Sequence, residues 1–268
     1  MKLGFIGAGN MAGAVIRGIL KSGLLRECDI AVTDIDPQKR GLYRAAGHPV
    51  YDDGAALTVS CTAVVLAVKP QQMRDVLALI APAMTPDKLL ISIAAGVSAQ
   101  TIKSAIGFDC KVVLAMPNMP LTLGFGATAL SRAEPATPED FRFACSLFGA
   151  AGVTQEIPPD KMNEIIPING SGPAFLYKFA ELIIAEAAAL GICPDAAMRL
   201  FCQTMIGSAK MLLESGKPAS KLIEEVCSPG GTTLAGLDAF EEHGFGNAVR
   251  AGFRACANRA AELSEINK

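Results

Sequence analysis

The chain opens with a strand, a glycine turn and a helix, and this order constrains its fold more than any other feature. Residues 3–6 form a short apolar run, and Gly7, Gly9 and Ala12 follow it in the spacing G-x-G-x-x-A. Apolar residues then recur at positions 15, 16, 19 and 20, which is helical spacing. In a dinucleotide-binding unit the first glycine permits a tight turn, the second lets a pyrophosphate approach the main chain, and the third small residue keeps the helix close to the sheet. The sequence therefore predicts that a dinucleotide binds at Gly7, Ala8, Gly9, Asn10 and Met11.

A second apolar run, residues 30–33, ends at Asp34. This carboxylate stands at the distance from the glycine turn at which an acidic residue reads the ribose hydroxyls. It would repel a 2′-phosphate, although Lys39 and Arg40 follow one turn later and can compensate. We therefore expect a nicotinamide dinucleotide, NADP or NAD, and Asp34 indicates that NAD is tolerated.

Further apolar runs alternate with helical patterns through the first half of the chain. The expected strands cover residues 63–68, 89–94, 112–116 and 127–130, and helical stretches separate most of them. This alternation predicts an α/β fold with a parallel, doubly wound sheet of the Rossmann type. Such sheets bind ligands at the carboxyl ends of their strands. The candidate cofactor-binding residues at those ends are Val68, Lys69, Pro70, Ala94 and Asn118.

From about residue 160 the strand patterns stop and long helical patterns continue to the C-terminus. We expect helices over residues 174–190, 194–214, 218–225 and 246–266. The predicted domains are therefore a dinucleotide-binding domain, 1–159, and an all-helical domain, 160–268. Small residues on the first of these helices permit close helix packing, and its extensive apolar face suggests a homodimer or a higher homo-oligomer.

Charge and residue usage exclude several classes of function. The 268 residues carry a net charge of −2 without a long basic run. The sequence therefore lacks the positively charged patch that binding to nucleic acid or to membrane phosphates requires. The strand pattern begins at once after Met1, and no apolar stretch is long enough to span a membrane, so we expect a cytoplasmic protein. Eight cysteines show no paired CxxC spacing and are expected to be reduced. Two isolated histidines indicate no metal site.

A second glycine-rich stretch, Ser228 to Thr233, stands directly before an apolar helical run that begins at Leu234. Pro229 fixes its entry, two glycines let a ligand reach the main chain, and the following helix presents unpaired N–H groups. A small carboxylate fits such a site. An ordinary loop with a helix cap is the alternative. The predicted substrate-binding residues are Ser228, Gly230, Gly231, Thr232 and Thr233.

The chain closely resembles the pyrroline-5-carboxylate reductases over nearly its whole length. The most specific match is residues 226–237, which contain the Ser228 to Thr233 stretch; the others cover residues 5–11, 67–70, 116–118 and 170–174. The resemblance implies an oxidoreductase that uses NAD(P)H to reduce the cyclic imine 1-pyrroline-5-carboxylate to L-proline, the last step of proline biosynthesis. It implies that backbone N–H groups of the loop hold the substrate carboxylate, and that Thr233 lies near the ring nitrogen as the catalytic side chain. It also implies helices that intertwine between two subunits.

Four features depart from the family pattern. Leu114 stands where the family usually has arginine, and Met119 where it has threonine or a small residue, so support of the intervening loop is altered. Asn169 replaces a serine, which exchanges one hydrogen-bonding side chain for another, and Cys227 replaces a residue of similar size. The segment after the second expected strand, residues 34–37, lacks the basic or hydroxyl residues common in members that prefer NADPH.

Two other functions fit the glycine turn. A β-hydroxyacid dehydrogenase has the same architecture with a catalytic lysine on the first helix of the second domain, where Lys178 is the only candidate and is poorly spaced from Gly172. A non-catalytic NAD(P)-binding protein would keep the glycine turn but would not need the Ser228 to Thr233 loop.

Overall fold

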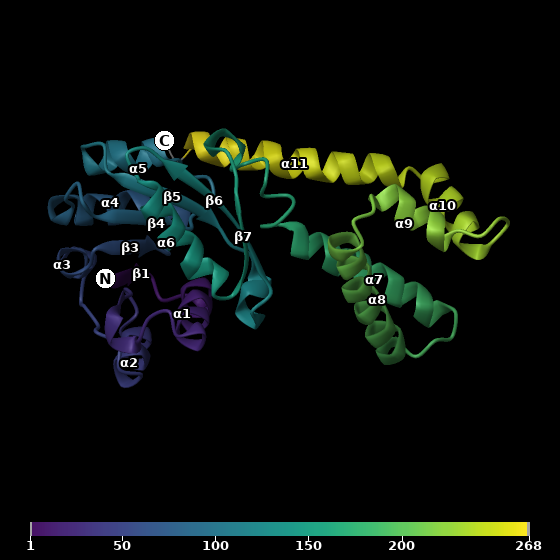
Figure 1. Cartoon of the computed structure of the whole chain (residues 1–268), viewed down its shortest axis with the longest axis horizontal. Coiled ribbons are helices and arrows are strands. Elements are labelled where there is room, and N and C mark those ends of the chain that lie inside the picture. The colour runs from purple at the N-terminus through teal and green to yellow at the C-terminus, as the bar shows by residue number, and fades with distance from the viewer. Residues whose placement is uncertain (1, 267–268) are drawn as a thin grey trace. The chain divides into compact units, whose positions relative to one another are not determined.

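The computed structural model describes residues 2–266 and divides them into two compact units. The first unit consists of two stretches of the chain, one up to Pro173 and the other from Ala255 onwards. The second unit is Ala174–Arg254. The first unit holds the sheet, and the second consists of helices (Figure 1).

A seven-stranded sheet forms the centre of the first unit among the residues that the structure describes, in the order β2-β1-β3-β4-β5-β6-β7. β1 to β5 are parallel, with Leu3 opposite both Ile30 and Ala63. The strands are β1 Leu3–Ile6, β2 Ile30–Thr33, β3 Ala63–Leu66, β4 Leu89–Ser92, β5 Lys111–Met116, β6 Gly126–Ala133 and β7 Gly152–Glu156.

One further segment extends the sheet beyond β2. Val50 forms an isolated parallel bridge with Val32, and Val32 bonds to the main chain of Pro49 and Tyr51. Residues 49–51 therefore take the place of an outer third strand, so that the parallel part of the sheet follows the doubly wound order 3-2-1-4-5-6 of dinucleotide-binding sheets. The predicted α/β fold of the Rossmann type is confirmed.

The expectation that all strands are parallel is wrong at β6, which is antiparallel to β5. The connection between them contains only the short 3₁₀ turn η4, Met119–Leu123, and a parallel crossover needs a longer link, usually with a helix. β7 returns parallel to β6 after helix α6, Pro138–Gly149. β7 was not predicted from the sequence, because its residues Gly-Val-Thr-Gln-Glu are largely polar and lie at the edge of the sheet.

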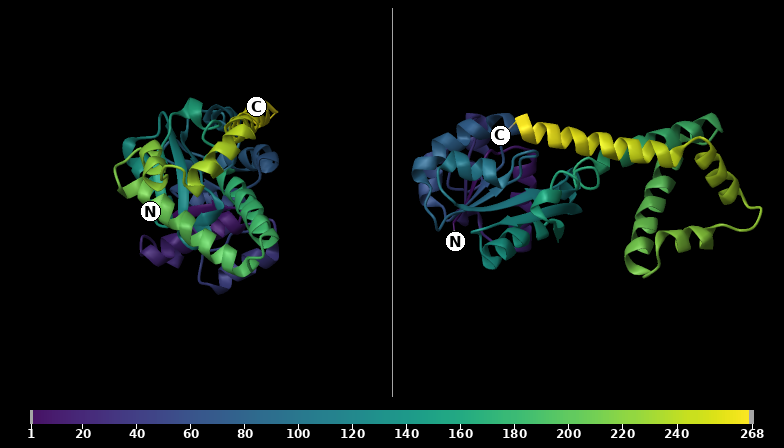
Figure 2. Two further views of the ribbon diagram at one scale, coloured as in Figure 1. Left: turned by 90° about the vertical axis from the view of Figure 1, so that its right-hand side faces the viewer. Right: turned by 90° about the horizontal axis from the view of Figure 1, so that it is seen from above.

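Helices cover both faces of the sheet and bury two separate cores (Figure 2). On one face, α1 and α6 pack Ile16, Ile19 and Phe148 against Phe5. On the other, α3, α4 and α5 bury Leu57, Leu77 and Ile102. Alternate residues of each strand point to opposite faces, which is why Phe5 and Ile6 belong to different cores. The helices of this unit before Pro173 are α1 Asn10–Ser22, α2 Pro37–Ala45, α3 Gly54–Ser60, α4 Met73–Ile80, α5 Ala99–Ile106 and α6.

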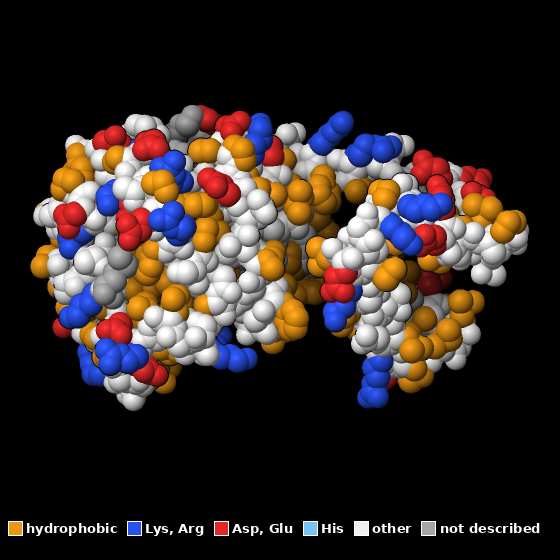
Figure 3. All heavy atoms as spheres, in the orientation of Figure 1, with side chains coloured by type: hydrophobic (Ala, Val, Ile, Leu, Met, Phe, Trp, Pro, Cys, Tyr) orange, Lys and Arg blue, Asp and Glu red, His pale blue; other side chains and the backbone are white. Residues whose placement is uncertain are grey.

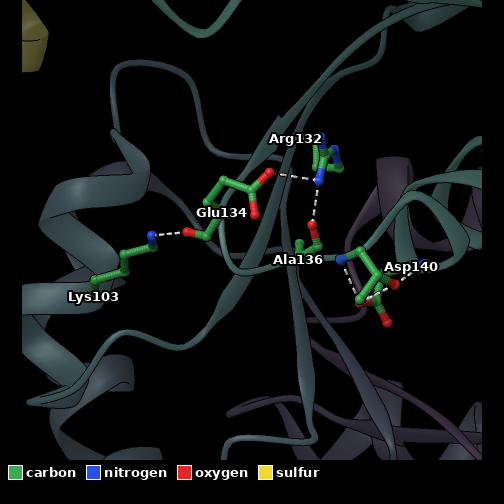
Figure 4. A network of polar contacts seen from close by, with 6 residues as sticks. Lys103, Arg132, Glu134, Ala136 and Asp140 are labelled. Atoms are coloured by element: carbon green, nitrogen blue, oxygen red, sulfur yellow. Dashed lines mark hydrogen bonds and ion pairs between the residues drawn. The ribbon is translucent and has the colours of Figure 1, made fainter.

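A polar network fixes the loop between β6 and α6 (Figure 4). Arg132 donates to the carboxylate of Glu134 at 2.8 Å and to the carbonyl of Ala136 at 2.6 Å, while Lys103 donates to the carbonyl of Glu134. Thr137 and Asp140 then form a reciprocal capping box at the start of α6. The loop backbone and the first turn of the helix therefore have their polar groups paired.

The first compact unit extends beyond the expected domain boundary at residue 159. Met162, Ile165 and Ile166 pack against the core on the α4 side of the sheet. Ser264, near the end of helix α11, Phe245–Ile266, donates to Asn163 at 3.1 Å. This segment consists of turns without periodicity, so no pattern of apolar residues indicates that it packs against the sheet.

In the second unit, residues 174–254, only Ala180 and Ala197 are buried. Phe179 nevertheless contacts Phe201 and Phe245 within the unit. Large apolar side chains remain exposed, among them Leu190, Leu200 and Leu213, and hydrophobic surface is visible over these helices in Figure 3. A unit with so little buried surface lacks a core of its own. Its helices are α7 Gly172–Ala189, α8 Pro194–Glu214, α9 Ala219–Val226, α10 Thr232–Glu242 and α11 Phe245–Ile266, of which α7 begins and α11 ends in the first unit.

Candidate active site

The glycine turn after β1 has the geometry of a dinucleotide site. Gly7 has a φ of +97°, and a Cβ there would lie 2.5 Å from the carbonyl oxygen of Ala67, so no other residue fits. Gly9 is the N-cap of α1, no side chain caps this end, and a Cβ at Gly9 would meet no atom within 4 Å. Open space therefore lies in front of unpaired N–H groups at the positive end of a helix, where a pyrophosphate fits.

Asp34, at the end of β2, is held by the glycine turn itself. Its Oδ2 accepts the backbone N–H of Ala8 at 2.7 Å, and its Oδ1 accepts that of Asp36 at 2.9 Å. Lys39 lies 3.7 Å from the same carboxylate, whose side chain is only 8% exposed. Asp34, which is predicted to bind the ribose hydroxyls, thus also links the glycine turn to the end of β2. A carboxylate has enough lone pairs to accept hydrogen bonds from the backbone and from a ribose at the same time.

A cavity of about 600 Å³ lies beside the turn and Asp34. It brings together five of the predicted cofactor-binding residues from three different strand ends: Gly7, Gly9, Asp34, Val68 and Lys69. The neighbouring cavity, about 460 Å³, is lined by Ala8, Gly9 and Asn10 on the other side of the turn. Together these cavities bring seven of the predicted cofactor-binding residues to the two sides of the glycine turn.

Arg17, Tyr43 and His48 line the smaller cavity and were not predicted from the sequence. His48 is buried, and its Nδ1 lies 3.0 Å from the carbonyl oxygen of Ile30, so it serves the packing of residues 46–50 against β2. Arg17 stands on α1 one turn after Gly13, which is a regular surface position of the helix. The sequence alone does not show that Arg17 lines a cavity, because the cavity forms only where residues of α2 lie beside α1.

The ends of β4 and β5 carry the remaining predicted positions. Ala94 lines a separate cavity of about 410 Å³ in the first unit, together with Met116. Asn118 is only 8% exposed, and its Oδ1 accepts the backbone N–H of Ala127 at 2.9 Å. The Asn118 side chain therefore holds the start of β6. Pro70 begins a 3₁₀ turn, Pro70–Gln72, after β3, and Met11 lies in the first turn of α1.

The predicted substrate loop, Ser228 to Thr233, lies in the second unit between α9 and α10. The Gly231 N–H donates to the carbonyl of Ser228 at 2.9 Å, and Gly230 has a φ of +68°. The positive φ that requires glycine is thus at Gly230, whereas Gly231 is extended and has Ser228 packed against it. The loop is a formed turn rather than an irregular connection.

Helix α10 starts two residues earlier than expected, at Thr232, with Gly231 as its N-cap. No side chain caps this end and no acidic residue occupies its first turn. Thr233 is therefore inside the helix, and its hydroxyl does not cap the helix N-terminus, as it would in an ordinary loop with a helix cap. Thr233 is partly buried and lines an apolar groove of about 940 Å³ with Met211 and Leu237. The loop therefore ends at a helix start that no side chain caps, with Thr233 in the first turn of the helix.

Other chemistries find less support. Lys178, the candidate of the β-hydroxyacid dehydrogenase reading, forms an exposed ion pair with Glu181 at 2.5 Å on the surface of α7. Within residues 2–266 no group of three or more His, Cys, Asp and Glu side chains is arranged to hold a metal ion. In the same part of the chain, no helix combines the length and the apolar character that crossing a bilayer requires.

The sheet order, the glycine turn at its centre and the acidic residue after β2 define a nicotinamide-dinucleotide-dependent oxidoreductase. Comparison with known proteins agrees with this class. A family model described as NADP oxidoreductase, coenzyme F420-dependent, matches residues 2–96, and one described as pyrroline-5-carboxylate reductase dimerisation matches residues 159–263.

Full-length relatives narrow the class further. Pyrroline-5-carboxylate reductase of Methanosarcina acetivorans is 36% identical over 98% of this chain and 97% of its own, and that of Escherichia coli K12 is 35% identical over 98% of both. A solved pyrroline-5-carboxylate reductase from Coxiella burnetii superposes with a TM-score of 0.90 at 31% identity over 98% of both chains. The Plasmodium falciparum enzyme, solved with NADP bound, has a TM-score of 0.89 at 28% identity over the same coverage. The chain belongs to the pyrroline-5-carboxylate reductase family.

Proposed function

We propose that this protein is an NAD(P)H-dependent reductase that converts 1-pyrroline-5-carboxylate to L-proline. The single observation that carries the proposal is the Ser228 to Thr233 turn at the open N-terminus of α10, in a chain whose relatives of equal length are named for this activity. A dinucleotide-binding protein without catalysis has no use for this second anion site.

The residues of the first unit fit a dinucleotide. Gly9 leaves open space before the N-terminus of α1, where N–H groups can bind the pyrophosphate, and Asp34 stands beside the cavity that would hold the adenosine ribose. Val68 and Lys69 line the same cavity from the end of β3. When bound, the reduced nicotinamide supplies the hydride.

The residues of the loop fit the substrate. The backbone N–H groups of Thr232 and Thr233 stand at the uncapped helix start and would bind the carboxylate, while the Gly231 N–H is bonded to Ser228 and, with Gly230, shapes the turn. The Thr233 hydroxyl would hydrogen-bond to the ring nitrogen and so orient the C=N bond as hydride reaches C5. The nitrogen takes the proton that completes the reduction from solvent water. No strong acid is needed, because most of the rate comes from holding the reacting carbon against the nicotinamide.

Three finer proposals follow. NAD should be accepted as well as NADP, since Asp34 is charged and the next residue is Ile35. The second unit should form a homodimer, since its helices leave large apolar side chains exposed. The eight cysteines are free thiols, which fits a reducing compartment such as the cytoplasm.

A spectrophotometric assay tests the main proposal. Purified protein mixed with NADPH or NADH should lose absorbance at the reduced-nicotinamide band only when pyrroline-5-carboxylate is added. Gly9→Ala is the matched variant, because a Cβ at this position would enter the space assigned to the pyrophosphate and would meet no protein atom within 4 Å. The variant should remain folded and lose nearly all activity. Absence of turnover by the wild type with both nucleotides would refute the proposal.

A further inference from the structure

Asn169 joins two strands at the edge where the sheet binds ligands. Its Nδ2 donates to the carbonyl oxygen of Met116 at 2.5 Å and to that of Ala127 at 3.3 Å, and the residue is only 7% exposed. Met116 is the last residue of β5, and Ala127 is the second residue of β6. One side chain from the segment after the sheet therefore holds both ends of the β5–β6 connection.

Asn118 completes this arrangement from inside the connection. Its Oδ1 accepts the N–H of Ala127 at 2.9 Å, while Asn169 binds the carbonyl of the same residue. Pro117 and Pro120 restrict the backbone on either side of Asn118. The segment from Met116 to Asn118 is thus fixed by two buried amides and two prolines.

The orientation of the Asn169 amide is informative. Its Oδ1 is buried and accepts no hydrogen bond from residues 2–266. A buried acceptor without a partner destabilises the fold, because the oxygen gives up its hydrogen bonds to water. Turning the amide over would place that oxygen against two carbonyl oxygens, so the N–H₂ edge must face them. The structure keeps the donor contacts to Met116 and Ala127 despite this cost.

We propose that Asn169 is a positioning residue for hydride transfer, acting by holding the Met116 to Asn118 segment at the strand end where the nicotinamide would lie. The proposal rests on the proposed reductase function, and on the rule that ligands bind beyond the carboxyl ends of the strands. The adenosine and pyrophosphate contacts assigned to Gly9 and Asp34 lie at other strand ends. Loss of the Asn169 contacts should therefore lower the rate of the reaction without weakening the binding of the dinucleotide.

Asn169→Asp is the decisive variant, because it keeps the shape of the side chain but replaces the donor by a carboxyl group. When ionised, that group cannot donate and faces two carbonyl oxygens, and this raises its pKa. At about pH 8 we expect kcat to fall roughly tenfold to a hundredfold, while the Kd for NADPH, measured by fluorescence, stays within about threefold. Near pH 6 the protonated carboxyl can donate one hydrogen bond, and kcat relative to the wild type at the same pH should recover about fivefold or more. Loss of packing alone would give no such recovery.

Two variants complete the experiment. Asn169→Ser keeps one donor and should retain kcat within about fivefold, and Asn247→Asp, on an exposed amide, should match the wild type at every pH. If Asn169→Asp does not fold, Asn169→Ala takes its place and should lower kcat at all pH values with an unchanged Kd for NADPH.

Wild-type kcat in Asn169→Asp at about pH 8, or in Asn169→Ala, would overturn the proposal. So would a fall in kcat matched by an equal loss of NADPH binding. If the wild type is active and the Asn169 variants keep its kcat, only the role of Asn169 is rejected. If the wild type oxidises no NAD(P)H in the presence of pyrroline-5-carboxylate, both the proposed function and the role of Asn169 are rejected.

Discussion

The carboxylate of Asp34 accepts the backbone N–H of Ala8 at 2.7 Å, so the acidic residue after β2 and the glycine turn after β1 form one unit. The ribose-reading position and the pyrophosphate-binding turn are consequently coupled. A change at Asp34 should alter both the choice of cofactor and the shape of the turn.

We predict that NADH competes well with NADPH in the wild type, and that Asp34→Ser shifts the ratio of kcat/KM values roughly tenfold towards NADPH. Removing the carboxylate removes its repulsion of a 2′-phosphate, while Lys39 remains close by. Steady-state kinetics with both nucleotides measures the ratio.

Asp36→Ser is the matched control for charge. It removes a carboxylate two residues further on, and serine preserves the N-cap of α2 that Asp36 provides. This variant should change the ratio by less than about threefold. A hundredfold preference of the wild type for NADPH would contradict the prediction.

Thr233→Ala should lower kcat/KM roughly tenfold to a hundredfold by removing a hydrogen bond of about 1 to 3 kcal/mol to the reacting end of the substrate. The melting temperature should not change, because the cap of α10 is the backbone of Gly231 and no side chain caps this end. Thr232→Ala is the control, since the role assigned to Thr232 is carried by its backbone N–H. Full activity of Thr233→Ala, or an equal loss in both variants, would show that the Thr233 hydroxyl has no special part.

A homodimer should appear in light scattering at low micromolar concentration, with about twice the 27.9 kDa mass of the chain. Leu213, on α8, is 84% exposed, and Leu213→Glu should shift the protein towards the monomer if the apolar surface of the second unit is the interface. Val153→Glu places the same charge on an exposed apolar position of the sheet unit and should leave the dimer intact. A stable, active wild-type monomer would be incompatible with this account.

Asp140 should make the first unit sensitive to acid. Burial alone would raise the pKa of this carboxyl, but hydrogen bonds from Thr137 and the ammonium of Lys111, at 3.1 Å, outweigh burial and hold the pKa below its ordinary value. A carboxyl with a lowered folded-state pKa stabilises the fold above its unfolded pKa of about 4, and this stability is lost as the pH falls through the folded-state pKa.

Urea unfolding followed by circular dichroism measures the effect. Asp140→Asn should lower the free energy of unfolding by about 1 kcal/mol at pH 7, and the difference from the wild type should shrink progressively as the pH falls below about 4. Asp160→Asn, which removes a carboxylate from an exposed pair with Lys161, should match the wild type across this range. A pH-independent difference for Asp140→Asn would contradict the assignment.

The sequence predicted the parts of the fold that periodicity encodes. The strand, turn and helix at residues 3–22 were recognised because their glycines and apolar residues fall at fixed spacings, and helix α8 has the predicted bounds, Pro194–Glu214. The antiparallel direction of β6 and the polar edge strand β7 were missed, since neither is encoded in a pattern of apolar residues. Asn169 was interpreted only as an exchange of one polar residue for another. Its contacts to Met116 and Ala127 depend on a turn segment that folds back on the sheet.

The reductase activity is tested most stringently by following the hydride itself. The protein is incubated with pyrroline-5-carboxylate and NADPH deuterated at C4, using each of the two stereochemical forms in turn, and the product is analysed by mass spectrometry. We predict L-proline that carries one deuterium at C5 with one of the two forms and none with the other. Oxidation of NADPH without proline, or proline unlabelled with both forms, would contradict the account.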